Sequence, residues 1–146
     1  MKILIAIDGS PSSLNALRHA IRLTEGKQGT HHFGLLNVHT PPAVAFDIGG
    51  LSHSMINDYL ERIGTEELAA AQELAQATQI SFEVLRRRGH PANEIVSVAQ
   101  HDHYDLLVMG TKGRSHFADT LLGSVAQRVA SMAALPLLLV PAAAAA

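Results

Sequence analysis

The chain has 146 residues, of which 47% are hydrophobic, and this is the size and composition of one globular domain with a buried core. A formal net charge of −2 and the lack of a long Lys/Arg run exclude a dedicated nucleic-acid binder, which needs clustered cations. There are no cysteines, so disulfides and thiolate metal sites are excluded. The apolar run near the N-terminus is too short for a signal peptide, and no run approaches the roughly 20 residues of a membrane span. We therefore expect a cytoplasmic protein without a membrane or nucleic-acid partner.

The first predicted element is a strand at Ile3–Ile7, a continuous aliphatic run that is typical of a strand buried on both faces of a parallel sheet. Apolar residues at helical spacing then predict a helix over about 12–24, with Ser12 or Ser13 as its N-cap. Phe33–His39 is predicted to be the second strand.

Prolines and glycines in residues 40–54 predict a long loop. A long amphipathic helix is expected over about 55–78, and Ser81–Arg87, which partly alternates apolar and polar residues, predicts a third strand nearer a sheet edge. The turn Gly89-His90-Pro91 should lead into a helix with Ile95 on its inner face.

The aliphatic run Leu106–Met109 predicts a fourth strand, Val125–Met132 marks the last helix, and Leu137–Val140 is the fifth strand. Strands and helices that alternate at this spacing predict a single doubly wound α/β domain. We expect a five-stranded parallel sheet of order 3-2-1-4-5 with helices on both faces, formed by residues 1–141, and a disordered Ala tail at 142–146. In this order the crevice between strands one and four is where ligands bind.

The loop from the fourth strand to the last helix contains the residues best suited to bind a ligand. Gly110 and Gly113 allow sharp turns and a close approach of backbone N–H groups to phosphate oxygens. Gly123 and Ser124 open a helix whose unpaired N–H groups and dipole favour an anion. Three side chains add positive potential to the loop: Lys112, Arg114 and His116. The alternative is a helix end, a turn and a cap that bind nothing.

The spacing G-x2-G-x9-G-[S/T], formed by Gly110, Gly113, Gly123 and Ser124, resembles the ATP-binding signature of universal stress proteins. The resemblance extends over nearly the whole chain. Its other matching segments are the opening Ile3–Ser10, the strand end Asn37-Val38-His39, the turn Gly89-His90-Pro91 and the closing Leu135–Pro141. Members without the glycine pattern are thought not to bind ATP, so the resemblance implies the ATP-binding branch.

The resemblance also implies residue roles. Ala6, Ile7 and Asp8 would border the adenosine, and Val38 would meet the adenine through its backbone. The segment 110–116 would line the ribose and phosphates, and the start of the last helix would hold the phosphates. The predicted site is therefore Ala6, Ile7, Asp8, Val38, Gly110, Thr111, Lys112, Gly113, Arg114, Ser115, His116, Gly123, Ser124 and Val125.

Two of these residues have simpler explanations. Asp8 can be a turn residue that caps the following helix, and Val38 can be a core residue of its strand. The nine histidines include no pair with metal-ligand spacing, so we expect no protein-made metal site. Mg²⁺ or Mn²⁺ would bind through the phosphates of ATP.

Two further segments allow two interpretations each. Arg86-Arg87-Arg88 predicts a solvated strand end rather than a phosphate or RNA contact. Leu137–Val140 would form an aliphatic edge strand, and in the family this strand commonly pairs with its twin, so the resemblance implies a homodimer. The alternative is a monomer in which Pro136 and Pro141 blunt that edge.

Taken together, the sequence predicts a nucleotide-responsive stress or signalling module. The alternative is a weak ATPase or a nucleotidyl- or phosphoryl-transfer enzyme, in which Lys112, Arg114, His116 and Ser124 stabilise a transferring group. The chain has no Walker A Gly-Lys-[Ser/Thr] and no obvious base for water, so enzyme activity stays uncertain and at most slow. A response-regulator receiver is excluded because strand one ends in the single acid Asp8 and strand five is followed by Pro141.

Overall fold

The computed structural model describes residues 1–41, 53–113 and 121–143. Strands and helices alternate along the chain, as the sequence predicts. The elements are β1 (Lys2–Ala6), α1 (Pro11–Thr24), β2 (His32–His39), α2 (His53–Ala77), β3 (Ser81–Arg88), α3 (Pro91–His101), β4 (Leu106–Gly110), α4 (Ser124–Met132) and β5 (Leu137–Val140). The five strands form one parallel sheet in the order β3-β2-β1-β4-β5, which confirms the predicted topology.

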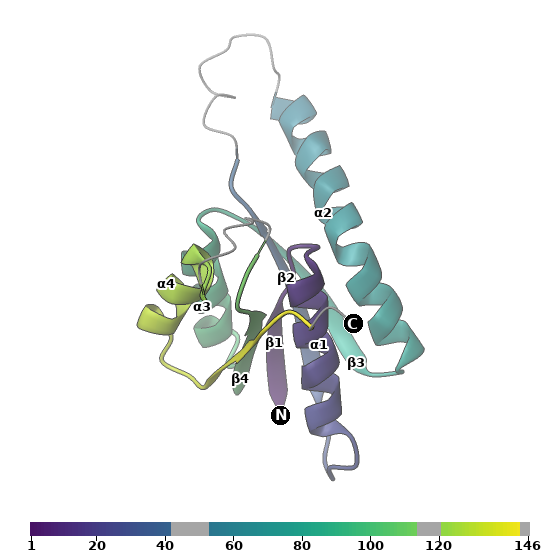
Figure 1. The fold of residues 1–146 in the computed structure, drawn as a ribbon. Helices are drawn as coiled ribbons and strands as arrows, with labels where there is room; N and C mark the ends of the chain where they lie inside the picture. Colours follow the sequence, from purple (N-terminus) through teal and green to yellow (C-terminus); the bar gives the residue numbers. More distant parts are fainter. Residues whose placement is uncertain (42–52, 114–120, 144–146) are drawn as a thin grey trace.

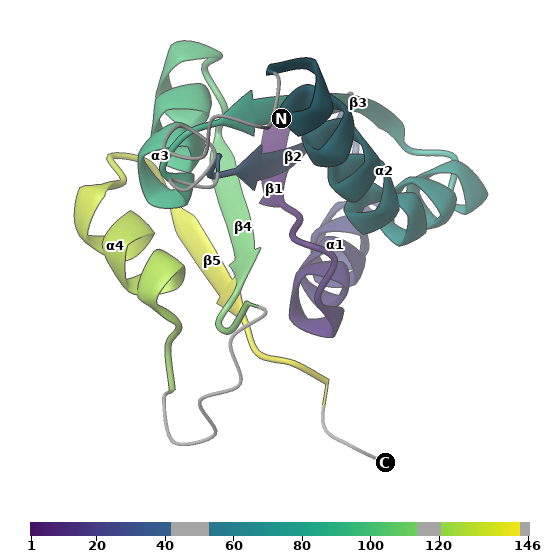
Figure 2. The same ribbon diagram turned by 90° about the horizontal axis from the view of Figure 1, so that it is seen from above.

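The sheet is the middle of three layers (Figure 2). Helices α1 and α2 cover one face and α3 and α4 cover the other. Alternate strand residues point to opposite faces, so Ile3 and Ile5 join the core under α1 and α2, while Leu4 joins the core under α3 and α4. All three side chains are fully buried, which explains the continuous aliphatic run in β1.

The predicted helix caps and boundaries need corrections. The N-cap of α1 is Ser10, not Ser12 or Ser13, because the Ser10 side chain accepts a hydrogen bond from the backbone N–H of Ser13. Pro11 is the first residue of the helix, where its missing N–H costs nothing. Helix α2 begins at His53, within the predicted loop 40–54, and residues 42–52 of that loop lie outside the described residues.

Helix α2 extends past the sheet (Figure 1), and side chains of β3 hold its N-terminal half. The Arg86 guanidinium lies 2.7 Å from a Glu61 carboxylate oxygen, and Arg88 donates to the Asn57 side chain. Two of the three consecutive arginines therefore bind α2 instead of ending in solvent alone. None of the helices in the described part of the chain has the length and apolar character needed to cross a membrane.

Candidate functional site: a cavity at the carboxyl ends of β1 and β4

A cavity of about 260 Å³ lies where the strand order reverses, at the carboxyl ends of β1 and β4. It is lined by every predicted site residue that the structure describes: Ala6, Ile7, Asp8, Val38, Gly110, Thr111, Lys112, Gly113, Gly123, Ser124 and Val125. The other three predicted residues, Arg114, Ser115 and His116, lie outside the described residues.

The cavity also has lining residues that the sequence analysis missed: Ser10, Ser13, Leu36, Pro91, Ile95, Met109 and Ala126. Two of them could have been found from their positions in the strands. Leu36 is two residues before Val38 on one strand, and therefore on the same face of the sheet. Met109 is the residue of β4 just before Gly110. The positions on α3 become visible only when the helix is packed on the sheet.

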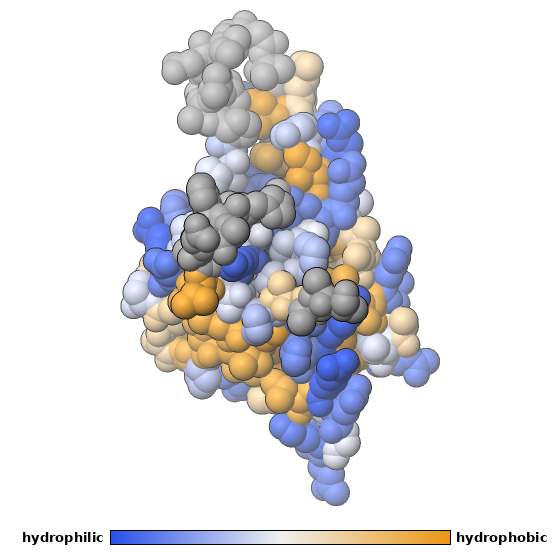
Figure 3. Space-filling view, in the orientation of Figure 1, coloured by the Kyte–Doolittle hydropathy of each residue, from blue (hydrophilic) through white to orange (hydrophobic). Residues whose placement is uncertain are grey.

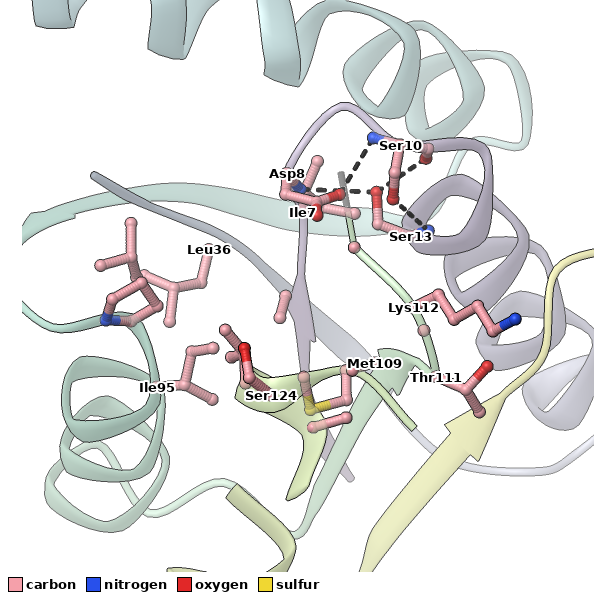
Figure 4. A pocket seen from close by; sticks show the side chains of 18 residues that line it. Ile7, Asp8, Ser10, Ser13, Leu36, Ile95, Met109, Thr111, Lys112 and Ser124 are labelled. Carbon is pink, nitrogen blue, oxygen red and sulfur yellow. Dashed lines mark hydrogen bonds between the residues drawn. The ribbon is translucent and has the colours of Figure 1, made fainter. Parts of the chain in front are cut away.

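The two sides of the cavity differ in chemistry (Figure 4). Leu36 and Ile95 form an apolar side, whereas Ser10, Ser13 and Asp8 lie across from them and form a polar side. A ligand with a flat, largely apolar part and a polar or charged part would match both sides.

Among the described residues, the backbone N–H and C=O of Val38 have no hydrogen-bond partner, and Val38 lines the cavity. Strand β1 ends at Ala6, opposite Leu36. On the edge of β2 that faces β1, the last hydrogen bond runs from Ile7 N–H to the Leu36 carbonyl at 2.8 Å. In parallel strands the backbone groups of successive residues point to opposite neighbours, and the His39 carbonyl points to the other side, where it accepts from Gly89 at 3.0 Å. The N–H and C=O of Val38 therefore point to the β1 side, beyond the end of β1. Side by side, they can bind the edge of a base.

The turn after β1 fixes the carboxylate of Asp8. One oxygen, Oδ1, accepts from the backbone N–H of Ser10 at 2.9 Å, and the Asp8 N–H lies 3.4 Å from the Ser13 hydroxyl oxygen. The hydroxyl of Ser13 donates to the Ser10 carbonyl at 2.9 Å. These contacts place Asp8 in the turn, as the simpler alternative expected, but the cap of α1 is Ser10 and not Asp8. They leave the second oxygen, Oδ2, beside Gly113, where a Cβ would lie only 2.8 Å from it.

At each of the three glycines of the loop, a side chain would meet a different neighbour. At Gly110 a Cβ would lie 2.2 Å from the Ser12 hydroxyl oxygen and 3.0 Å from the Ser12 carbonyl carbon, so this glycine is required by packing against α1. Gly113 leaves room for the carboxylate of Asp8. At Gly123 a Cβ would be 3.3 Å from the Thr111 carbonyl oxygen and 3.7 Å from the Gly113 nitrogen, so it would stand between the loop and the start of α4.

The amides that can meet an anion are those at the start of α4. Gly123 N–H already donates to the Thr111 carbonyl at 2.6 Å, and Thr111 N–H donates to Val140 at 3.0 Å. The first bond within α4 comes from Gln127 N–H to the Gly123 carbonyl at 3.0 Å. The N–H groups of Ser124, Val125 and Ala126 therefore have no acceptor within the helix, as in the first turn of any helix, and all three residues line the cavity.

No group of three or more potential metal-binding side chains occurs among residues 1–41, 53–113 and 121–143. The donors that line the cavity instead suit a nucleotide, with a backbone N–H and C=O pair for a base, a carboxylate for hydroxyl groups and helix amides for phosphate. The fold and the cavity together define a doubly wound α/β protein with a candidate ligand site at the strand-order reversal.

Comparison with known proteins identifies the family. The model of the universal stress protein family matches residues 1–141, and the chain belongs to this family. Universal stress protein MJ0531 of Methanocaldococcus jannaschii is 36% identical over 139 residues, covering 95% of this chain and 81% of the relative. Universal stress protein YxiE of Bacillus subtilis is 31% identical over 144 residues, covering 95% and 97%.

Solved structures share the fold. The hypothetical protein MJ0577 superposes with a TM-score of 0.81 at 24% identity, over 96% of this chain and 94% of that one. A universal stress protein in complex with cAMP gives a TM-score of 0.68 at 26% identity, over 98% of both chains. An Arabidopsis thaliana family member with AMP bound gives 0.71 at 16% identity, over 99% of this chain and 93% of that one.

Proposed function

We propose that this chain is an ATP-binding universal stress protein that acts as a nucleotide-responsive stress or signalling module in the cytoplasm. The observation that carries the proposal is the cavity itself, where the Val38 N–H and C=O pair and the first amides of α4 have no partner among the residues that the structure describes. A family member with 26% identity has been solved in complex with cAMP, which supports an adenine nucleotide as the ligand.

In this proposal the backbone of Val38 binds the N1 and N6 edge of adenine, between apolar side chains such as Leu36 and Ile95. Oδ2 of Asp8 accepts a hydrogen bond from the ribose hydroxyls. The amides at the start of α4 and the Ser124 hydroxyl donate to the phosphates, and Lys112 and the other loop cations add positive potential. A Mg²⁺ or Mn²⁺ ion would be held mainly by the phosphates.

We propose binding rather than rapid hydrolysis as the function. Among the described residues that line the cavity, Asp8 is the only carboxylate, and its Oδ1 already holds the turn through Ser10 N–H. A general base must reach an attacking water, and no second acidic or imidazole side chain lines the described cavity. The alternative is a weak ATPase or a phosphoryl- or nucleotidyl-transfer enzyme at the same site. Linear release of ADP over many turnovers by the wild type, and its loss in the variant Gly113→Val, would favour this alternative.

The test is calorimetric titration of the purified protein with ATP and of the variant Gly123→Val. Backbone φ at Gly123 is −66°, which any residue adopts, so the variant should fold. Its branched side chain would fill the space between Gly113 and α4 and should abolish ATP binding. Ala130→Val adds a similar volume at an exposed position of the same helix and should bind ATP normally. Unchanged affinity in Gly123→Val would contradict the site.

We also propose a homodimer through β5. This strand lies at the sheet edge, and hydrophobic side chains gather on the surface where β5 and α4 lie (Figure 3). The Pro136 carbonyl accepts from Leu107 of β4 and the Val140 carbonyl accepts from Thr111, which follows β4. The backbone groups of Leu137 and Leu139 therefore point to the outer edge. Leu139→Pro removes an outward donor and should turn a dimer into a monomer in light scattering. A wild-type monomer would refute the dimer.

A further inference from the structure

A second cavity, of about 340 Å³, adjoins the base end of the candidate site. It is lined by Val38, His39, Thr40, Tyr59, Leu60, Ile63 and Pro91. Val38 and Pro91 line both cavities, so the two meet at this pair of residues. We propose that the second cavity is a subsite for an apolar group carried on N6 of a bound adenine nucleotide. The inference rests on the proposed function, because it requires the base to lie against Val38.

The direction of β2 places N6 on the side of the second cavity. Within Val38 the N–H precedes the C=O along the chain, so the carbonyl lies nearer to Thr40. With N1 of adenine accepting from the N–H and N6 donating to the C=O, the exocyclic amine occupies the Thr40 side of the ring. N6 has two hydrogens, and only one is used in the bond to Val38. The other is directed along the strand toward His39 and Thr40, which line the second cavity.

The walls of this subsite favour an apolar group over a charged one. Two of its polar side chains already contact other groups of the protein. The Thr40 hydroxyl donates to the Gly89 carbonyl at 3.0 Å, and His39 Nε2 lies 2.9 Å from a Glu67 carboxylate oxygen. The remaining wall is formed by apolar and aromatic residues, of which Tyr59, Leu60 and Ile63 belong to α2, Val38 to β2 and Pro91 to α3. Hydrophobic residues also gather on the surface of α2 (Figure 3).

Tyr59 is the residue of the subsite that is best placed to contact such a group. It is 47% exposed, although it lines the cavity, so its ring has contact area left for a ligand. The guanidinium of Arg62 lies over the ring at 5.7 Å from its centre and restricts its orientation. An apolar cavity of about 150 Å³ is sufficient to bind benzene in another protein. The second cavity is open to solvent but has a larger volume, about 340 Å³, so it has room for a benzyl group on N6.

The test compares the calorimetric affinities of ATP and N6-benzyl-ATP for the wild-type protein and for Tyr59→Ala. Burying the benzyl group should make N6-benzyl-ATP bind roughly tenfold or more tightly than ATP to the wild type. Tyr59→Ala should reduce this preference at least about threefold and leave the affinity for ATP unchanged. The exposed side chain of Tyr59 makes misfolding of the variant no concern. Leu23→Ala, which also removes a partly exposed side chain but far from both cavities on α1, should keep the full preference.

The outcomes separate this inference from the proposed function. Binding of ATP with no preference for N6-benzyl-ATP overturns the subsite and leaves the nucleotide site standing. A preference that Tyr59→Ala does not reduce shows that the benzyl group lies elsewhere, which also overturns the subsite. If neither nucleotide binds, the proposed function fails and the inference fails with it.

Discussion

The contact between Asp8 and Gly113 allows one prediction to be worked out from geometry. In the variant Gly113→Ala the new Cβ would lie 2.8 Å from Oδ2 of Asp8, closer than real Cβ atoms approach other atoms. The carboxylate is the end of a side chain and can rotate, so the conflict should be relieved by displacement of Asp8 rather than by loss of the fold. The methyl group should therefore act on the ligand through Asp8.

The magnitude follows from the bonds that Asp8 makes. Losing a hydrogen bond between a carboxylate and a ribose hydroxyl costs about 1.5–3 kcal/mol, which weakens ATP binding roughly 10- to 150-fold. Displacement also breaks the bond from Ser10 N–H to Oδ1, which is worth about 1.5–3 kcal/mol by the same rule, so the melting temperature should fall by about 3–12 °C.

A double-mutant cycle tests the reasoning. ATP affinity is measured by calorimetry for the wild type, Gly113→Ala, Asp8→Ala and the double variant. If the methyl group acts through Asp8, Gly113→Ala should weaken binding in the wild type and have almost no further effect in the Asp8→Ala background. Equal losses in both backgrounds would refute this explanation and indicate that the methyl group meets the phosphates directly.

Three other predictions follow from single features. Guanine would place its N1–H against the Val38 N–H and its O6 against the Val38 C=O, so neither pair could form a hydrogen bond. Because each unpaired buried group costs about 1–3 kcal/mol, ATP should bind at least roughly tenfold more tightly than GTP in a competition binding assay. Gly110→Ala should cost about 1–3 kcal/mol of unfolding free energy by denaturant titration, because a Cβ would collide with Ser12. Burial and the hydrogen bond to Glu83 raise the pKa of Tyr104 above its ordinary value of about 10. The stabilisation that the Tyr104 hydroxyl gives is therefore complete below pH 10 and decreases as the pH rises above 10. Between pH 9 and 11, the free energy of unfolding of Tyr104→Phe should decrease less than that of the wild type.

The strands of this protein could be predicted because the parallel sheet buries both of their faces. Ile3–Ile7 and Leu106–Met109 are continuous aliphatic runs for this reason, and the structure has strands at Lys2–Ala6 and Leu106–Gly110. The binding role of Val38 could not be derived in the same way. Its backbone groups have no partner in the described ranges because β1 ends opposite Leu36 while β2 continues to His39. The relative lengths of paired strands are not encoded in a local pattern.

The glycines show the same limit at the level of single residues. A sequence marks where side chains are absent but not what occupies the space. The three loop glycines were predicted to give phosphates access to the backbone, yet Gly110 is explained by Ser12 and Gly113 by Asp8. Only at Gly123 does the missing side chain open space between the loop and a helix start, and even there the N–H is taken by Thr111.

The turn that carries Asp8 is fixed from both helices on its face of the sheet. On the α1 side it is held by the Ser10 and Ser13 bonds already described. On the other side the buried Asn37 side chain donates to the Ile7 carbonyl at 2.9 Å and to a Glu67 carboxylate oxygen of α2 at 2.8 Å. Gly9, in the left-handed region at φ 81°, packs against that same glutamate, whose side chain would lie 3.0 Å from a Cβ there. Asn37 and its two partners lie 30 positions apart in the sequence, so no local pattern predicts these contacts. They nevertheless help to determine where the Asp8 carboxylate points.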